Sequence, residues 1–271
     1  GKWHLSIIGD TVFLTNGVSN IYKTGASSKI YVENSISIAS TEEFKGHVIT
    51  AGFDDSYYNQ AWKDYFSTAF NSVTPIEYSM SKTTIAWSSV NAGDLLWLFH
   101  PEDAFVGPLA LESNYDFYKN WIYRGDSGFM DLPMLGEIKA VKKSGEFLFV
   151  YGVNKTAICQ FVYDPVVSLA VVQYLNYGLY NRESIDGDSF THFMIDNKNN
   201  LRKVVNGQVE KIGFSKYFMD ETFSLTYHEK YDEVYINGTS KSYTYNKGLM
   251  ELGYNIPSAF SYKSAEYLIY K

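Results

Sequence analysis

The residues best suited to bind a metal ion or to move a proton near neutral pH are the five histidines, which are dispersed along the chain: His4, His47, His100, His192 and His228. No two of them stand at a ligand spacing such as His-x-x-x-His. The single cysteine, Cys159, can neither form an internal disulfide nor complete a zinc site without several nearby histidines. We therefore expect structural or surface histidines, and we predict no metal ion and no cofactor.

The segment Gly125-Asp126-Ser127-Gly128 resembles the nucleophile turn of trypsin-like proteases, in which a serine attacks the substrate carbonyl. That chemistry requires a general-base histidine within hydrogen-bond reach and an acid that orients it. The chain lacks the alanine-alanine-histidine-cysteine signature of that family, and Phe129 replaces the second glycine of the oxyanion loop. We predict that Ser127 is not a nucleophile and that the protein is not an enzyme.

Carboxylates facing one another could cleave a glycosidic bond, because one can act as the acid and another as the base or nucleophile. The candidates are Asp10, Asp94 and Glu146. Each stands at the turn that opens a predicted strand, where acidic residues are common because they stabilise turns. A carbohydrate-binding or glycoside-cleaving protein is therefore an alternative function and not the leading one.

The composition favours an all-β protein that does not read DNA. Aromatic residues make up 17% of the 271 residues, including 24 Tyr and 18 Phe, and such residues favour the pleated surface of a sheet. The net charge of −7 and the presence of only three arginines disfavour sequence-specific contact with nucleic acid. No apolar run reaches the roughly 18 residues of a membrane helix, and no signal-peptide core follows the N-terminus, so we expect no membrane insertion.

The stretch from Leu179 to Gly213 shows most clearly how these residues must be positioned. Three strand-like runs follow one another there: Phe190 to Ile195, Leu201 to Val205 and Gln208 to Ile212. A turn at Asp186-Gly187-Asp188 precedes them, and Asp196 to Asn200 and Asn206-Gly207 separate them. Asp-Gly and Asn-Gly supply the positive φ angles of tight hairpins, so the stretch is predicted to be a β-meander of three or four strands.

Similar turn-and-strand openings recur at residues 9, 46, 93, 145, 187 and 231, which are 37 to 52 residues apart. A repeat length of about 40 to 50 residues, with about four strands in each repeat, is typical of propeller blades. We predict a single domain over residues 1–271, an all-β propeller of about six blades built from four-stranded antiparallel meanders. The alternative is a β-sandwich whose hairpins are evenly spaced.

Two segments depart from the strand pattern. At about residues 57–74 apolar side chains recur at helical spacing, which predicts a short helical insertion between the second and third meanders that ends before Pro75. Its aromatic face could cap the propeller edge, or it could contact neighbouring subunits through Tyr57, Tyr58, Trp62, Tyr65, Phe66 and Phe70. Residues from about 100 to 133 contain three of the six prolines and are predicted to form a long loop between blades.

Three segments of the sequence resemble successive propeller blades in tail proteins of short-tailed bacteriophages. They are GEIKAVKKSGEFLFVYGVNKTAICQF, LYNRESIDGDSFTHFMIDNKNNLRKVVNGQVEKIG and YDEVYINGTSKSYTYNKGLMEL. The similar families are the packaged-DNA stabilisation proteins, which complete the head or form the tail hub, and the nozzle or tail tubular proteins. The resemblance covers most of the chain from about Gly93 onward and, more loosely, the opening GKWHLSIIGDTVFLTNGVSNIYK.

The resemblance implies a structural virion protein of the tail, assembled in the host cytoplasm. Copies would form a ring, a hexamer by resemblance, which continues the DNA channel and binds the portal or adaptor and other tail proteins. An acidic ring would let DNA pass, because phosphates bind where positive charge neutralises them. Since the chain is shorter than the longer members of these families, hub, nozzle and accessory roles all stay open.

The two ends of the chain are expected to meet. An open ring of blades would leave a long apolar edge exposed, and such edges promote aggregation. We therefore predict that a strand at Trp3 to Ile8 pairs with strands near Ala265 to Tyr270.

Overall fold

The structure is a computed structural model of the 271-residue chain. It describes residues 3–8, 11–18, 20–23, 31–33, 37–54, 81–88, 128–163, 168–252, 258–262 and 265–269. Two compact units divide the chain: Gly1–Val141 with Phe161–Ala170, and Lys142–Gln160 with Val171–Lys271. We refer to them as unit 1 and unit 2 and describe each by itself.

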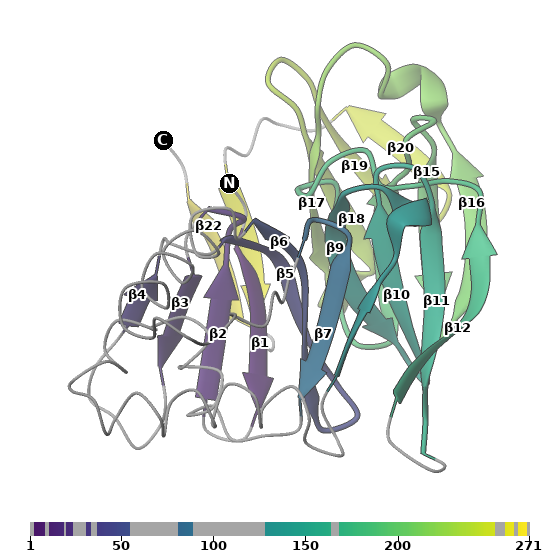
Figure 1. Ribbon diagram of the computed structural model, residues 1–271. Helices are drawn as coiled ribbons and strands as arrows, with labels where there is room; N and C mark the ends of the chain where they lie inside the picture. The colour runs from purple at the N-terminus through teal and green to yellow at the C-terminus, as the bar shows by residue number, and fades with distance from the viewer. Residues whose placement is uncertain are drawn as a thin grey trace, which may run out of the picture. The chain divides into compact units, whose positions relative to one another are not determined.

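The first two sheets each contain four antiparallel strands that pair in sequence order (Figure 1). The first consists of β1 (His4–Ile8), β2 (Thr11–Thr15), β3 (Asn20–Lys23) and β4 (Tyr31–Glu33). The second consists of β5 (Ser37–Phe44), β6 (His47–Asp54), β7 (Thr84–Ser88) and β8 (Gly128–Asp131).

Three further four-stranded sheets follow the same order. They are β9 (Ile138–Ser144), β10 (Phe147–Gly152), β11 (Thr156–Val162) and β12 (Ser168–Leu175); β13 (Ile185–Gly187), β14 (Thr191–Ile195), β15 (Leu201–Val205) and β16 (Gln208–Gly213); and β17 (Ser224–His228), β18 (Glu233–Asn237), β19 (Ser242–Asn246) and β20 (Leu249–Leu252). β21 (Ser258–Tyr262) and β22 (Ala265–Ile269) form a two-stranded sheet. Three short 3-10 turns complete the described elements: η1 (Pro133–Leu135), η2 (Ser215–Tyr217) and η3 (Glu229–Tyr231).

The fold is all-β and of the β-propeller class, as the sequence predicts. In each of the five larger sheets every strand pairs with the next strand along the chain, which is the meander expected of a blade. Five such sheets and the two-stranded β21–β22 pair account for the described strands, whereas the sequence predicts about six four-stranded blades. The predicted pairing between the two ends of the chain stays a prediction.

The second sheet shows that the predicted boundaries between blades are wrong in this part of the chain. β7 and β8 belong to the same sheet as β5 and β6, so residues 100–127 connect two strands of one sheet rather than two blades. The opening predicted at residue 93 falls in the same connection, outside the described residues. β8 was predicted to be loop; it is a strand because it pairs with Thr84–Trp87, a partner remote in sequence that no local pattern reveals. The predicted helix at 57–74 also lies outside the described residues, in the connection from β6 to β7.

The meander of β13–β16 confirms the clearest sequence prediction, with one shift. Asn206 and Gly207 adopt positive φ values of 47° and 82° and turn the chain from β15 into β16. Asp186 and Gly187, predicted as a turn, instead belong to β13. Gly187 is needed there because a Cβ atom would lie 2.3 Å from the Cα of His192, which it pairs with on β14.

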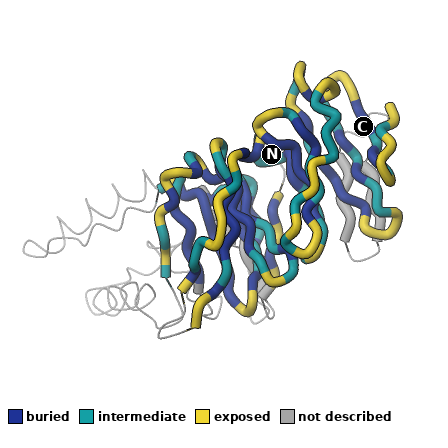
Figure 2. The backbone as a smooth tube through the Cα atoms, turned by 90° about the vertical axis from the view of Figure 1, so that its right-hand side faces the viewer, coloured by how far each residue is buried: buried dark blue, intermediate teal, exposed yellow. Residues whose placement is uncertain are grey.

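Each unit has a core of large apolar side chains. In unit 2 the core joins β14–β15 to β17–β19 and includes Phe193, Leu201, Leu225 and Ile236. In unit 1, Phe161 stacks on Phe44 at 5.6 Å between ring centroids and lies edge-on to Trp87 at 6.3 Å. Buried residues, in dark blue, lie along the central strands, and exposed residues, in yellow, lie mainly at turns and outer strands (Figure 2). No helix in the described ranges is long and apolar enough to cross a membrane.

β1 reverses the usual pattern over its first four residues, since His4 and Ser6 are buried while Leu5 and Ile7 are exposed. The Nδ1 atom of His4 lies 2.7 Å from Oγ of Ser40, and Oγ of Ser6 lies 2.9 Å from Oγ1 of Thr41. These hydrogen bonds offset the cost of removing polar groups from water. Hydroxyl and imidazole contacts therefore join β1 to β5 within unit 1.

Candidate functional site

The densest polar network described is centred on Asp196, at the start of the turn between β14 and β15. Its carboxylate is fully buried, and Oδ1 accepts hydrogen bonds from the backbone N–H groups of Lys198 (2.9 Å) and Asn200 (2.8 Å). The side-chain amide of Asn200 donates to the same oxygen at 3.2 Å. Asn199 takes the left-handed conformation at φ 58°, which asparagine tolerates better than most residues. The local sequence thus folds around its own aspartate.

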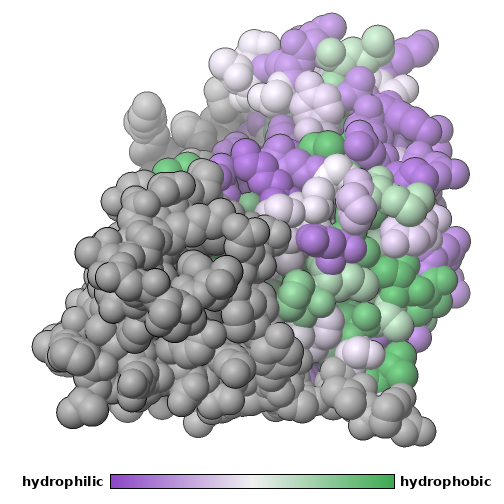
Figure 3. Space-filling model, viewed as in Figure 1, coloured by the Kyte–Doolittle hydropathy of each residue, from purple (hydrophilic) through white to green (hydrophobic). Residues whose placement is uncertain are grey.

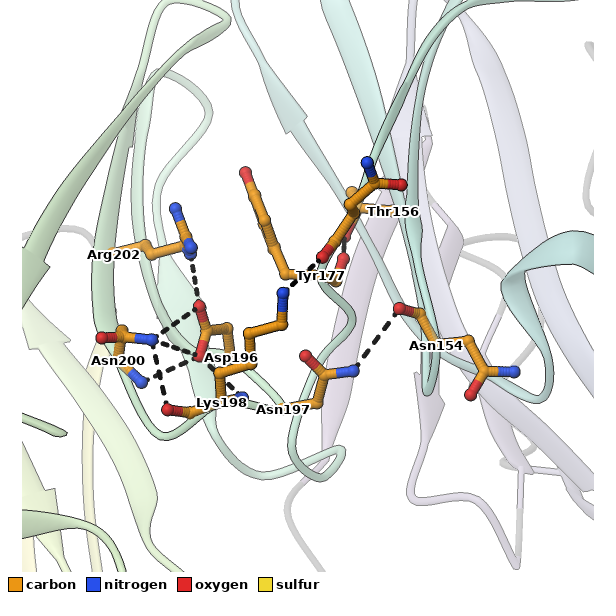
Figure 4. A network of polar contacts seen from close by, with 9 residues as sticks. Asn154, Thr156, Tyr177, Asp196, Asn197, Lys198, Asn200 and Arg202 are labelled. Atoms are coloured by element: carbon orange, nitrogen blue, oxygen red, sulfur yellow. Dashed lines mark hydrogen bonds and ion pairs between the residues drawn. The ribbon is translucent and has the colours of Figure 1, made fainter.

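Arg202 on β15 supplies the positive charge that a buried carboxylate needs. Its Nε donates to Oδ2 of Asp196 at 2.6 Å, and its guanidinium lies 3.7 Å from the centroid of the Tyr177 ring (Figure 4). An ion pair with such hydrogen bonds compensates for lost hydration, and the ring adds a cation–π contact. Arg202 is therefore held from two sides, by Asp196 and by Tyr177.

Further hydrogen bonds connect this turn to the segments before it within unit 2. Asn197 donates through Nδ2 to the carbonyl of Val153 at 2.8 Å, and Lys198 donates through Nζ to the carbonyl of Asn176 at 3.1 Å. Thr156 in β11 donates through Oγ1 to the carbonyl of Tyr177 at 2.8 Å. The turn of one sheet, the β10–β11 turn and the connection after β12 are thereby joined into one polar network.

A second buried pair lies deeper in unit 2. The hydroxyl of Tyr151 on β10 and Nε2 of His192 on β14 are 2.6 Å apart, and Phe149 packs edge-on against the same imidazole at 5.6 Å. Burial, with the nearby charge of Lys142, lowers the pKa of His192 to about 3. Burial also raises the pKa of Tyr151 well above its usual value. The imidazole is consequently neutral at physiological pH.

The pKa values of two other side chains are raised, which limits the chemistry that these groups can perform. Burial raises the pKa of Tyr177 to about 12, an effect that the positive charge of Arg202 opposes. Burial raises the pKa of the Cys159 thiol to about 12 as well. General acid–base catalysis works best with pKa values near the operating pH, and a reactive cysteine needs a lowered one. Together with His192, these groups keep one protonation state near pH 7, which suits a structural tie.

A comparable but exposed contact joins the next two segments of unit 2. Glu221, in the connection after β16, accepts hydrogen bonds from the backbone N–H of Ser240 (2.8 Å) and from its hydroxyl (2.9 Å). Lys241 forms an ion pair with Asp220 at 3.3 Å. In both places, a turn between the second and third strands of a sheet is bound by side chains to the connection that precedes that sheet.

Most of the residues singled out in the sequence are not brought together. The predicted interface residues Tyr57, Tyr58, Trp62, Tyr65, Phe66 and Phe70 lie outside the described residues, as do Ser127, Asp10, Asp94 and His100. Glu146 lies in the turn between β9 and β10, as predicted. Of the remaining histidines, His47 packs against Phe161 with its ring tilted at 4.4 Å between centroids, and His228 stacks on Tyr231 at 4.7 Å. Within the described ranges, no group of three or more His, Cys, Asp or Glu residues could hold a metal ion.

The sequence analysis missed the network around Asp196. The segment Asp196 to Asn200 is recognisable as a turn, and Arg202 is one of only three arginines, so a buried partner for it could have been suspected. Its contact with Tyr177 depends on how the connection after β12 lies, and no residue pattern specifies that.

The chain matches no protein-family model and no curated protein. Among solved structures it is similar to Hsv2 of Kluyveromyces marxianus, with a TM-score of 0.43 and 7% identity, covering 90% of this chain but only 60% of that one. It is also similar to Kluyveromyces lactis Hsv2, with a TM-score of 0.42, 12% identity and coverage of 92% and 71%. A chain of a nidogen/laminin complex gives a TM-score of 0.44 at 10% identity, with coverage of 99% and 85%. Likenesses this distant carry nothing about what this chain does.

Proposed function

We propose that the protein is a structural component of a bacteriophage tail, a hub or nozzle subunit that forms part of a ring around the DNA path and offers attachment sites to other tail proteins. The proposal starts from the resemblance of the segments that form β9–β11, β13–β16 and β18–β20 to blades of such proteins. It assigns the protein to the virion and gives it no catalytic role.

The observation that supports this role best is the use made of the buried polar groups in unit 2. Asp196, Arg202 and Tyr177 bind one turn to the segments before it, while Tyr151 and His192 join strands β10 and β14 deeper in the unit. Burial keeps the pKa values of Tyr151, Tyr177 and His192 well away from neutrality, so these three groups hold the strands in place without exchanging protons. A part that must stay rigid while DNA passes benefits from such ties.

The assembly of the purified protein tests the proposal. Mass photometry and electron microscopy are expected to find closed rings with one symmetric number of copies, and particles of the source phage should contain the chain at the tail. Replacing Trp62 and Phe66 by Ala should weaken ring formation while leaving the β-rich circular dichroism spectrum unchanged. A protein that never forms rings and is absent from virions would overturn the proposal.

One surface favours the carbohydrate-binding alternative. At the turn between β17 and β18, Tyr231 is half exposed and stacks on His228, and the side chain of the adjacent Asp232, which pairs with Lys203 at 3.3 Å, is 44% exposed. Aromatic rings beside carboxylates can bind sugar rings and their hydroxyl groups. A glycan array and a panel of chromogenic glycosides separate the two functions, because specific binding that is lost in Tyr231→Ala and Asp232→Asn would favour the alternative.

A further inference from the structure

The fourth strands of the five larger sheets differ in how their outer edges are protected. Four contain charged residues: Glu33 in β4, Asp131 in β8, Glu210 with Lys211 in β16, and Glu251 in β20. β12 contains none in its sequence Ser-Leu-Ala-Val-Val-Gln-Tyr-Leu, although with eight residues it is the longest of the five. Charge is a common device that stops unpaired strand edges from joining another chain. β12 lacks that device.

β12 is an edge strand with exposed apolar side chains. It pairs with β11 and ends the order of its sheet. Val172 is 56% exposed and Tyr174 39%, and they lie on the same face because side chains alternate along a strand. Val162 and Tyr163, where β11 ends, are exposed as well. Figure 3 shows apolar residues gathered at the lower right of the molecule, in the region where Figure 1 labels β11 and β12.

We propose that β12 pairs antiparallel with β12 of a second copy of this chain across a two-fold axis. A free strand edge offers backbone N–H and C=O groups that only another extended strand satisfies in register, so the occupant is a β-strand. The proposal does not depend on the role in a phage tail.

The sequence of β12 makes it a suitable partner for itself. A two-fold axis perpendicular to the sheet leaves the same face of the sheet outward in both copies. Paired residues must therefore point to the same face, so each residue of β12 pairs either with itself or with a residue two, four or six positions away in the second copy. With Val172 opposite Val172, Ala170 faces Tyr174 of the second copy, and these are favourable apolar cross-strand pairs. The same arrangement at β16 would bring charged residues from both copies into one seam. At β12 no side chains of like charge approach, although each copy carries a net charge of −7.

The size of the seam sets the expected strength. One eight-residue strand per copy buries less than the roughly 1,200 Å² of total surface typical of stable complexes. The dimer should therefore form reversibly, at concentrations on the order of micromolar or above. Sedimentation velocity over a concentration series is expected to detect a reversible doubling of mass, which for a single chain is a change from 30.9 kDa to twice that mass.

Two substitutions test the seam. Val172→Lys would place two ammonium groups opposite each other at the axis and is expected to weaken the dimer at least about tenfold. Gln208→Lys adds the same charge to the exposed start of β16 and should leave dimerisation unchanged. Thermal melting of both variants checks that the fold survives, which is expected because both side chains are exposed.

A disulfide tests the register directly. Opposed residues in antiparallel strands have Cα atoms about 4.5–5.5 Å apart, within the range that a disulfide spans. Val172→Cys should give a covalent dimer under mild oxidation, Gln208→Cys should not, and the natural Cys159 is fully buried. The inference is overturned if the protein stays monomeric at all concentrations, or if Val172→Lys leaves the dimer intact. Rings of more than two copies that are unaffected by Val172→Lys would also overturn it, while supporting the proposed tail function.

Discussion

His192 and Tyr151 illustrate how burial decides what an ionisable side chain can do. A surface histidine would titrate near pH 6.5, but this imidazole is enclosed beside Phe149 and forms a hydrogen bond with the Tyr151 hydroxyl. Its pKa of about 3 means that the folded protein resists protonation at this site. The unfolded chain binds this proton readily, so the free energy of unfolding must depend on pH.

We predict that His192 makes the protein sensitive to acid. Between about pH 6.5 and pH 3 the unfolded chain binds a proton that the folded protein excludes, so stability falls as pH falls, by at most about 1.4 kcal/mol per pH unit. His192→Gln does not titrate and should lose this contribution. In urea unfolding, the advantage of the natural protein over the variant is expected to shrink as pH is lowered from 7 to 4. A difference that stays constant with pH would contradict the prediction.

Glycine can be required at a turn for two different reasons: the backbone conformation, and the lack of space for a side chain. Gly207, between β15 and β16, has φ +82°, and a Cβ there would lie 2.3 Å from Cδ2 of Phe147. Gly248, between β19 and β20, has φ +91° but has no atom within 4 Å of the position of a Cβ. Both need a conformation that other residues adopt at a cost, while only Gly207 also needs the space.

Alanine at these two positions should therefore have different effects. Gly248→Ala is expected to cost about 1–2 kcal/mol of stability from backbone strain alone. Gly207→Ala should cost a further 1–3 kcal/mol or so, because Phe147 must move. Chemical denaturation of both variants measures the difference. Equal losses would mean that Phe147 gives way freely.

The same contrast explains what the sequence could predict. β14, β15 and β16 were placed correctly because Asn206-Gly207 and Asp196 to Asn200 mark their turns locally. β8 was missed because its partner, Thr84–Trp87, lies some 40 residues earlier in the chain. The Asp196–Arg202 pair was missed because Tyr177, which covers the guanidinium, is placed by a connection without regular structure. Local chemistry predicted turns and strands, while contacts between distant segments needed the structure.

For the chain as a whole, we predict that the last strand contributes strongly to stability. β22 pairs with β21 along five residues, so deleting residues 265–271 removes the partner of that strand. The truncated protein should melt at least about 5 °C lower or aggregate, because an apolar strand edge becomes exposed. Deleting only Tyr270 and Lys271 serves as the control and should have little effect. Unchanged melting of the longer truncation would contradict both this expectation and the predicted joining of the chain ends.

The second sheet has a further consequence, for the order in which the chain folds. Hairpins such as β14–β15 close over a few residues, whereas β7 must find Ala51 as the partner of Ile85 and Asp131 as the partner of Thr84. Closing long loops costs entropy before any contact repays it, and such distant pairing slows folding. A newly made chain should therefore acquire β13–β20 early and the β5–β8 sheet late. During that interval the apolar strand β7 is a site at which misfolding or chaperone binding would begin.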